Sequence, residues 1–389
     1  MFIHFYYSLV PNSGDIRRIK NINKELSDFY GTNSIEVCFY GFKDRKIIKK
    51  WGKFKVNDSS YKKFYVFQPP KVHWYFPWFQ SFIIAIIGMI YHVDLAVGEM
   101  IFPYKFKEFF KFFNPKSKIF VDIHGARVEE LISIQPDTDV RQIEAERERE
   151  SYSVDKASYV ICQSDEMKKY IVTEYGQDSE KILVYRCGYD STLFSYSSEA
   201  RKITREELKL TDNDILFVYA GGMHKWQKIE DSLAVFNSYH VVNSNSKFLI
   251  LTGDQEELRN ILESEKYSGI KDSIISFSVP FSSVSKYLSA ADIAFLIRDN
   301  HKMNAVASPT KLAEYLACGL PIITSEVAKC WVSEQGLPFL LFIEKGDVND
   351  RIKTIIKHVN KKEIEEYALN NLSLEIDRRT IESFLRALR

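Results

Sequence analysis

Residues 215–228, with the sequence ILFVYAGGMHKWQK, show the pattern that decides the fold: an apolar run, paired glycines and basic residues, before a helical pattern begins at Ile229. Along the whole chain, short runs rich in Ile, Val, Phe and Tyr alternate with longer segments of helical period. Such alternation is typical of β-α-β units and a parallel sheet. The expected strands are 2–9, 35–40, 93–98, 118–123, 159–164 and 182–186 in a first series, and 215–220, 247–252, 274–278, 292–297, 321–324 and 338–343 in a second.

A polar stretch from Asp190 to Arg205 separates the two series and has the composition of a linker. The pattern therefore predicts an α/β protein of two doubly wound, Rossmann-like domains, at residues 1–190 and 191–374. Residues 375–389 are expected to form a terminal helix that packs back on the first domain. Ligands of such sheets bind at the carboxyl ends of the strands, so we expect the site in a cleft where the two sheets face each other.

The composition is that of a globular protein of 389 residues, 45% of them hydrophobic and 27% charged. The 53 Lys and Arg against 52 Asp and Glu leave a formal net charge of +1, which argues against a dedicated nucleic-acid binder. The charge is unevenly distributed, because residues 1–120 hold 19 basic and 9 acidic side chains and carry +10, while the remainder carries −9. The basic first part predicts an anionic partner surface.

The five cysteines, at positions 38, 162, 187, 318 and 330, show no paired spacing. They indicate neither a disulfide framework nor a zinc site, and they fit a reducing cytosol. The first residues lack the basic region and the cleavage site of a signal peptide. The most apolar run, FIIAIIGMIY at 82–91, has ten residues, whereas a bilayer span needs about twenty. We expect a cytoplasmic protein in which this run forms a buried or interfacial helix.

Aromatic residues are interleaved with lysines in two stretches near that run, VHWYFPWFQ at 72–80 and YKFKEFFKFFNPKSK at 104–118. Basic and aromatic side chains on one face suit an anionic membrane surface, which would place the protein at the inner face of the cell membrane with a lipid-linked acceptor. The alternative is a helical stripe that belongs to the core, formed by Phe106, Phe109, Phe110 and Phe113. No nucleic-acid module accompanies these aromatics, so base stacking is disfavoured.

The segment SPTKLAEYLACGLPII, residues 308–323, is the most informative motif. Ser308 is expected to be an N-cap and Pro309 the first helical residue, and a helix start of this kind attracts an anion. Thr310 and Lys311 would add a hydroxyl and a positive charge to a phosphate site. Glu314, one turn later, would either accept hydrogen bonds from a sugar diol or pair with Lys311. The segment also fits an ordinary capped helix that packs on a sheet.

Paired glycines follow the expected strand 215–220, and Gly221 and Gly222 let the backbone approach a ligand closely. The next basic side chains can neutralise a diphosphate leaving group: His224, Lys225 and Lys228. The loop fits a tight strand-to-helix turn with solvated lysines equally well. A second turn places Gly253 and Asp254 after strand 247–252, where Asp254 is the expected N-cap of the next helix.

Two loops of the first half also follow expected strands. Gly14 lies in PNSGDIRR, residues 11–18, where it would allow close approach of a substrate, and Arg17 and Arg18 are expected to be solvated. His124 lies in VDIHGAR, where it would hydrogen-bond a sugar hydroxyl or remain a structural residue. No catalytic-triad or metal-ligand spacing appears, and the acidic run at 137–139 is expected to be a surface loop.

Together these segments resemble the retaining nucleotide-sugar glycosyltransferases of the GT-B fold, in particular the glycosyl transferases group 1 family, number four in the usual classification. DKASYVICQS at 155–164 is similar to the family's aD-x-vi-x-x-S, and RCGYDSTLF at 186–194 to its nGvD-x-x-x-F. The resemblance covers most of the chain in register, and its further motifs are Gly14, His124-Gly125, Gly221-Gly222, Gly253-Asp254, AADIAFLI at 290–297 and residues 308–323.

The resemblance implies an acceptor-side first domain and a second domain that binds a nucleotide-diphosphate sugar. Lys311 would meet the diphosphate and Glu314 the ribose, basic residues after Gly222 would neutralise the leaving group, and His124 would contact the donor sugar. Arg298, just past strand 292–297, is a candidate by position. The implied catalytic residues are His124, Lys228 and Glu314, and the implied donor-binding residues are Gly14, Gly222, His224, Lys225, Gly253, Arg298, Ser308, Pro309, Thr310 and Lys311.

The family's chemistry implies sugar transfer with retention, without metal or cofactor, to a glycan or lipid-linked acceptor of surface-glycan assembly. Three positions depart from the family pattern. Val306 stands where many members have a second glutamate, Cys187 replaces the usual Asn before Gly188, and the basic run ends in Lys228 without a following glycine. Two alternatives stay open, namely a non-catalytic GT-B subunit that binds glycan or a partner transferase, and a nucleotide-sugar epimerase.

Overall fold

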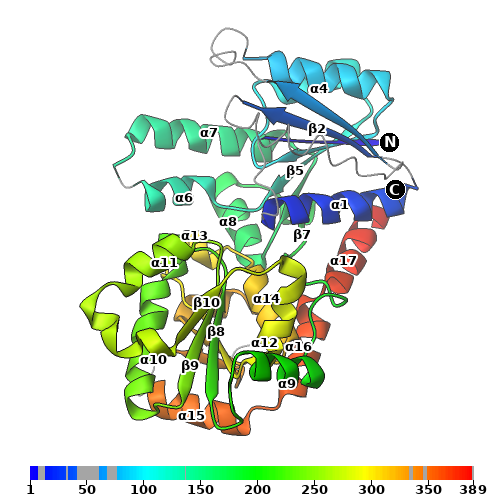
Figure 1. Cartoon of the computed structure of the whole chain (residues 1–389). Helices are drawn as coiled ribbons and strands as arrows, with labels where there is room; N and C mark the ends of the chain where they lie inside the picture. The colour runs from blue at the N-terminus through cyan, green and yellow to red at the C-terminus, as the bar shows by residue number, and fades with distance from the viewer. Residues whose placement is uncertain are drawn as a thin grey trace. The chain divides into compact units, whose positions relative to one another are not determined.

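The chain folds into two compact units, residues 1–186 with 378–389, and residues 187–377. Their boundaries lie at Arg186 and Asp377, where the sequence predicted 190 and 374. Each unit is built on one parallel sheet with helices on both faces, so the predicted doubly wound α/β fold is confirmed (Figure 1). This computed structural model describes residues 1–7, 14–31, 34–41, 61–67, 77–135, 137–332, 336–344 and 348–387.

The first unit has a sheet of seven parallel strands in the order β3-β2-β1-β4-β5-β6-β7. These strands are β1 Phe2–Tyr7, β2 Ser34–Tyr40, β3 Tyr61–Phe67, β4 Leu95–Glu99, β5 Lys118–Ile123, β6 Tyr159–Cys162 and β7 Ile182–Val184. Their helices are α1 Gly14–Tyr30, α4 Phe79–Ile90, α5 Phe106–Phe113, α6 Arg127–Ile134, α7 Val140–Lys156, α8 Asp165–Tyr175, the 3-10 turn η2 Ser179–Lys181 and most of α17 Leu374–Ala387.

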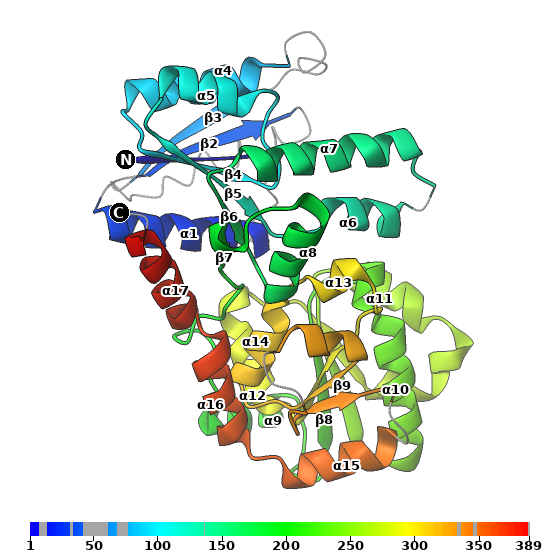
Figure 2. The ribbon, with the colours of Figure 1, turned by 180° about the vertical axis from the view of Figure 1, so that it is seen from behind.

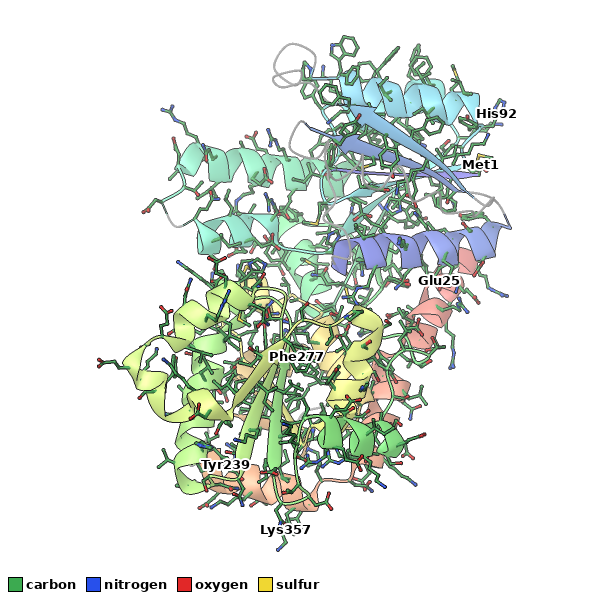
Figure 3. The ribbon with its side chains drawn as sticks, in the orientation of Figure 1. Met1, Glu25, His92, Tyr239, Phe277 and Lys357 are labelled. Atoms are coloured by element: carbon green, nitrogen blue, oxygen red, sulfur yellow. The ribbon has the colours of Figure 1, made fainter. Side chains whose placement is uncertain are left out.

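Apolar side chains at helical spacing bind α1 to this sheet. Ile19, Ile22 and Leu26 recur every three or four residues and are buried. Arg378, the fifth residue of α17, donates to Glu25 on α1 at 2.9 Å, and Figure 3 labels Glu25 on that helix. Figure 2 shows α1 and α17 side by side. The last segment of the chain therefore belongs to the first unit, where Ile381 joins the core.

The second unit has six parallel strands in the order β10-β9-β8-β11-β12-β13. They are β8 Ile215–Ala220, β9 Ser246–Leu251, β10 Ile274–Phe277, β11 Ile293–Leu296, β12 Ile322–Thr324 and β13 Leu340–Phe342. The helices are α9 Ser198–Glu207, α10 Ile229–Val242, α11 Gln255–Leu262, α12 Val284–Ala290, α13 Lys302–Ala305, α14 Thr310–Ala317, α15 Val348–His358 and α16 Lys361–Leu372, with 3-10 turns η3 Lys225–Gln227, η4 Glu265–Ser273, η5 Phe281–Ser283 and η6 Glu326–Cys330.

Two apolar layers cover the faces of the second sheet. One contains side chains of α12, α14 and α16, and the other side chains of α10 and α15 (Figure 1). Strand residues alternate between the layers, as in Leu216 and Phe217. A sheet covered on both faces needs near-continuous apolar strands, which explains why these runs were visible in the sequence.

All twelve expected strands appear, shortened at one or both ends in most cases, but β3 was missed. This edge strand has the sequence YKKFYVF, and its two adjacent lysines interrupt the apolar pattern that the other strands show. Lys63 extends to Glu36 of β2 at 2.8 Å, so part of its charge is paired across the sheet. The pairing of β3 with β2 therefore accounts for this strand better than its own apolar pattern does.

Helices α4 and α5 pack against each other at the β3 side of the first unit (Figure 2). Residues 82–91 thus form most of α4, with one side buried, as expected. Within the described residues, the structure contains no helix long and apolar enough to cross a membrane. Of the predicted phenylalanine stripe, Phe106 and Phe110 are buried in the core, whereas their neighbour Phe112 is 79% exposed.

Candidate functional site

The side chain of Lys311 lies against the glycine turn that follows β8. Gly221 has a φ of 151°, and a Cβ added there would lie 2.2 Å from Lys311 Nζ. Lys311 Nζ donates hydrogen bonds to Tyr219 Oη at 3.1 Å and to Gln227 Oε1 at 2.9 Å. The turn requires glycine because a larger residue would displace the lysine from this position.

Lys311 and Arg298 are two partly buried cations without a carboxylate partner. Among the described residues, no carboxylate oxygen lies within 4.0 Å of either charged group. Arg298 Nε is buried without a hydrogen bond to that part of the chain, and Arg298 Nη1 reaches Asn304 Oδ1 only at 3.4 Å. Burial, followed by the charge of Arg298, lowers the pKa of Lys311 to about 7. This positive charge costs free energy until an anion approaches it.

The N-terminus of α14 lies beside these cations because Tyr315 anchors the helix to β8. Its hydroxyl accepts a hydrogen bond from Ala220 N–H at 2.9 Å. The prediction that Ser308 caps the helix is wrong: Pro309 is the N-cap, and Ser308 Oγ instead accepts from Cys187 N–H at 3.2 Å. Among the described residues no side chain caps the first turn, which contains Thr310, and uncapped backbone N–H groups of this kind are able to bind an anion.

Glu314 lies on α14 one turn after Lys311 and is 6% exposed. The alternative that it pairs with Lys311 is not realised, since the Lys311 ammonium binds Tyr219 and Gln227. A carboxylate at this depth is able to accept hydrogen bonds from a diol while an added anion occupies the cations one turn earlier.

The three basic residues after Gly222 differ in their surroundings. Lys228, with a left-handed φ of 50°, pairs through Nζ with Asp299 at 3.2 Å and Asp231 at 3.3 Å, and the hydrogen bond to Asp299 raises its pKa. His224 is exposed and stacks on Trp226, with ring centroids 4.4 Å apart, and Lys225 is also exposed. Lys228 is thus already neutralised, unlike Lys311.

The second glycine turn, at Gly253, borders a cavity of about 880 Å³. Asp254 precedes α11 as predicted, but its side chain does not cap that helix; Oδ2 accepts from Met223 N–H at 2.9 Å. The same oxygen would lie 3.2 Å from a Cβ on Gly222, so Asp254 and Gly222 fit closely together. Asp254 therefore ties the two turns to each other.

In the first unit, the parallel register gathers polar side chains at neighbouring strand ends. Glu99 on β4 pairs in register with Asp122 on β5, and His124 follows two residues later. His124 Nδ1 lies 3.3 Å from Glu99 Oε2 and 3.6 Å from Asp122 Oδ2. Burial alone would lower the pKa of His124, but the nearby carboxylates of Asp122 and Glu99 outweigh burial and raise this pKa to about 9.

Arg18 is buried, which corrects the expectation of a solvated charge. Its guanidinium donates to both oxygens of Asp122, at 2.6 and 2.7 Å, and to the carbonyl of Tyr185 at 2.6 Å. Although burial alone would raise it, the charge of Arg18 lowers the pKa of Asp122 well below its usual range. Arg18 is buried because the apolar face of α1 packs on the sheet and brings this residue next to Asp122 on β5.

Glu99, Asp122 and His124 place their ligand atoms within 4.8 Å of one another. A metal would need a neutral histidine and unoccupied carboxylate lone pairs. Here the Arg18 guanidinium takes both oxygens of Asp122, and the raised pKa keeps His124 protonated. The three residues therefore act as an ion-pair network.

A cavity of about 440 Å³ opens beside this network. Its lining includes Tyr6, Glu99, His124, Glu130 and Glu146. Position 125 favours glycine because Glu130 Oε1 lies against its backbone and would clash with an added Cβ. The surface combines hydrogen-bond acceptors with one protonated imidazole.

The sequence analysis missed the roles of three residues at this site: Glu99, Arg18, and His4, whose Nε2 contacts Glu99 Oε1. The available signal was a polar residue inside an apolar strand, as with His4 in FIHFYY, or at its end, as with Glu99. Gly14 begins α1, and residues 11–13 of its predicted loop lie outside the described residues. The predicted surface run 137–139 is indeed exposed at both aspartates, and Asp139 caps α7.

Comparison with known proteins gives a family match for most of the second unit. Residues 214–361 match the family model described as "Glycosyl transferases group 1". The chain is 25% identical over 173 residues to an uncharacterized glycosyltransferase, MJ1069, of Methanocaldococcus jannaschii. That match covers 44% of this chain and 41% of the relative, so it spans well under half of either protein.

Solved structures resemble the chain over almost its whole length. HepE of Anabaena, solved with UDP, matches with a TM-score of 0.72, 13% identity and 99% coverage of both chains. WaaG, a glycosyltransferase involved in lipopolysaccharide biosynthesis, matches with a TM-score of 0.62, 12% identity and coverage of 95% of this chain and 94% of its own. These likenesses show that the two-unit architecture is the GT-B fold.

Proposed function

Because residues 214–361 match the family model of the glycosyl transferases group 1, we propose that this protein is a retaining, metal-independent glycosyltransferase. It moves a sugar from a nucleotide-diphosphate sugar to a glycan or lipid-linked acceptor. The observation that carries the proposal is the partly buried pair of Lys311 and Arg298 beside the N-terminus of α14; among the described residues, neither has a carboxylate oxygen within 4.0 Å. Cations and a helix N-terminus supply the charge stabilisation that a departing diphosphate needs.

The donor would bind with its diphosphate on Lys311, Arg298 and the first turn of α14. Lys225, which is exposed, can reach outward to the same anion, whereas Lys228 would first have to leave its two aspartates. The buried carboxylate of Glu314 would accept hydrogen bonds from the ribose hydroxyls. HepE was solved with UDP, which makes a uridine diphosphate sugar the first donor to test. In the first unit, we assign His124 a role toward a sugar oxygen.

A thermal-shift panel of UDP-, GDP- and dTDP-sugars tests this function. A ligand that binds the folded state at 100 times its Kd stabilises it by about 2.7 kcal/mol, so the correct donor should raise Tm measurably. Transfer or slow hydrolysis of that donor should accompany the shift. A chain that binds no nucleotide would be the non-catalytic subunit instead, and conversion of a free nucleotide sugar without acceptor would identify an epimerase.

Replacing Glu314 with Gln should weaken donor binding about 10-fold or more. The amide lacks the negative charge that strengthens hydrogen bonds accepted from two hydroxyl groups. The loss should be larger for UDP than for inorganic diphosphate, which has no ribose. Isothermal titration with both ligands measures the difference. Glu363→Gln, at an exposed position on α16, is the matched control and should bind both ligands normally. Equal losses for the two ligands would contradict the ribose assignment.

A lipid-linked acceptor is supported by an exposed aromatic surface on α4 and α5. Trp78 stacks on Phe109, Phe82 contacts Phe113, and Phe112 and Ile90 are 79% and 59% exposed. The segment that contains α5 also carries four lysines, namely Lys105, Lys107, Lys111 and Lys116. Exposed aromatics beside cations suit the headgroup region of an anionic bilayer. We therefore propose peripheral contact of this surface with the membrane.

Replacing Phe112 with Ser should reduce co-flotation with anionic liposomes several-fold, because it removes the most exposed aromatic ring of the surface. Wild-type protein should float with vesicles that contain phosphatidylglycerol and not with pure phosphatidylcholine. Val241→Ser is the control, since Val241 is 78% exposed on the second unit and far from this surface in the chain. Lipid-independent flotation, or an equal effect of both variants, would rule out the membrane proposal.

A further inference from the structure

His4 is a buried histidine whose two ring nitrogens both face acceptors. Its Nδ1 lies 2.5 Å from Asn23 Oδ1, and its Nε2 contacts Glu99 Oε1. The Asn23 amide is fixed by Nδ2, which donates to Glu36 Oε1 at 3.0 Å, so Oδ1 must face the ring. A ring that meets an acceptor on each side carries both protons, and His4 is therefore an imidazolium. Consistently, the charge of Glu99 raises its pKa against the effect of burial.

Glu99 lies between two histidines. One oxygen contacts His4 Nε2, and the other lies 3.3 Å from His124 Nδ1. Glu99 is only 5% exposed, and within the described residues its Oε2 accepts no regular hydrogen bond. His124 Nδ1 likewise makes no regular hydrogen bond within the described residues, so the two groups are joined by charge attraction at 3.3 Å. A fixed, buried carboxylate at this distance favours the ring orientation that keeps Nδ1 beside it.

We propose that Glu99 is a positioning residue: fixed by His4 through one oxygen, it orients the ring of His124 with the other, so that His124 presents a charged donor to a substrate oxygen in the 440 Å³ cavity. His4 and Asn23 act through Glu99, and none of these three residues needs to touch substrate. The role of His124 toward substrate rests on the proposed function. The orientation and protonation of its ring do not.

Other charged groups also face His124. Asp122 on β5 favours the protonated ring, whereas Arg18 on α1 disfavours it. Arg127, Glu130 and Glu146 line the same cavity, and Arg127 pairs with both glutamates. Asp122 is held by Arg18, so Glu99 is the carboxylate whose charge is shared by the two histidines.

Ring titration of ¹⁵N-histidine-labelled, full-length protein by NMR tests the proposal without any substrate. In the wild type, His124 should titrate near pH 9. Glu99→Gln keeps the shape of the side chain but removes its charge, and should lower the titration midpoint of His124 by about one pH unit or more. Glu146→Gln, in the lining of the same cavity, should shift it far less. In transfer assays, the high-pH limb of kcat/KM should move down with the midpoint in Glu99→Gln.

Glu99→Asp keeps the charge on a shorter arm and provides the second variant. It should retain a raised His124 midpoint while kcat falls, since the ring is no longer held in the same orientation. A wild-type midpoint at or below the ordinary value of about 6.5 would overturn the proposal even if neither variant folds. An unchanged midpoint in Glu99→Gln would also overturn it. Failure of donor binding in the nucleotide panel would instead contradict the proposed function and leave the ring titration unaffected.

Discussion

Replacing Lys311 with Met is expected to lower kcat/KM by about 10²–10³, because the variant loses a preorganised cation at the diphosphate. The methionine keeps the length of the side chain, so the Gly221 turn can stay in place. Arg298→Met should have a comparable effect, and the double variant should lose less than the product of the two single effects, because both cations would act on the same anion. Steady-state kinetics with the donor identified by thermal shift measure these losses.

The same substitution should raise the stability of the donor-free protein. Lys311 is a partly buried cation near Arg298 without a carboxylate partner, and its removal relieves both desolvation and repulsion. We expect Lys311→Met to have a higher Tm than the wild type without donor, and to show no increase in Tm when donor is added. Lys353→Met is the control, since Lys353 is 51% exposed and its loss should alter neither quantity. A lower Tm in Lys311→Met would show that the lysine stabilises the empty unit and contradict this interpretation.

The lowered pKa of Lys311 also predicts a pH dependence. Its folded-state pKa of about 7 lies below the unfolded value of about 10.5, so the unfolded chain binds more protons between these limits. The contribution of Lys311 to stability should therefore improve as pH rises from about 7 to 10.5, and Lys311→Met should abolish that slope. Donor binding at pH 7 should take up about half a proton, measurable by titration calorimetry in buffers of different ionisation enthalpy.

Replacing Arg18 with Met should destabilise the first unit by about 3–5 kcal/mol, because it leaves Asp122 buried without its bidentate partner. The carbonyl of Tyr185 would lose its donor as well. Urea unfolding, followed by pulsed hydrogen exchange of the peptide that contains β5, measures the change. Arg378→Met is the matched control, since that pair with Glu25 also involves α1 but Arg378 is 41% exposed, and its loss should cost under about 1 kcal/mol.

The double variant Arg18→Met, Asp122→Asn should recover part of the lost stability, because it removes the unpaired negative charge. The pair itself contributes stability above the unfolded pKa of Asp122, about 3.9, and that contribution is lost as pH falls through the lowered folded-state value. The difference between wild type and Arg18→Met should thus shrink in acid. A constant difference between pH 7 and pH 3 would contradict a charge-based origin.

Local patterns predicted much of this protein. The apolar runs marked every strand except β3, because a strand covered on both faces must be apolar almost throughout. The segment 308–323 predicted α14 with Lys311 and Glu314 one turn apart, and the positions of His124 and Arg298 followed from the ends of strands. These features depend on neighbours in the sequence, which is the range over which periodicity and turn residues carry information.

The charge partners, in contrast, were decided by tertiary structure. Arg18 meets Asp122, Lys228 meets Asp299, and Glu99 joins His4 to His124 only because the register of parallel strands brings distant residues to one sheet edge. Sequence by itself determined the two doubly wound sheets and the glycine turns. Tertiary structure determined which cations are paired with carboxylates, such as Lys228, and which, like Lys311, have no carboxylate oxygen within 4.0 Å among the described residues. The reason is that electrostatic attraction depends on distance and burial and not on separation along the chain.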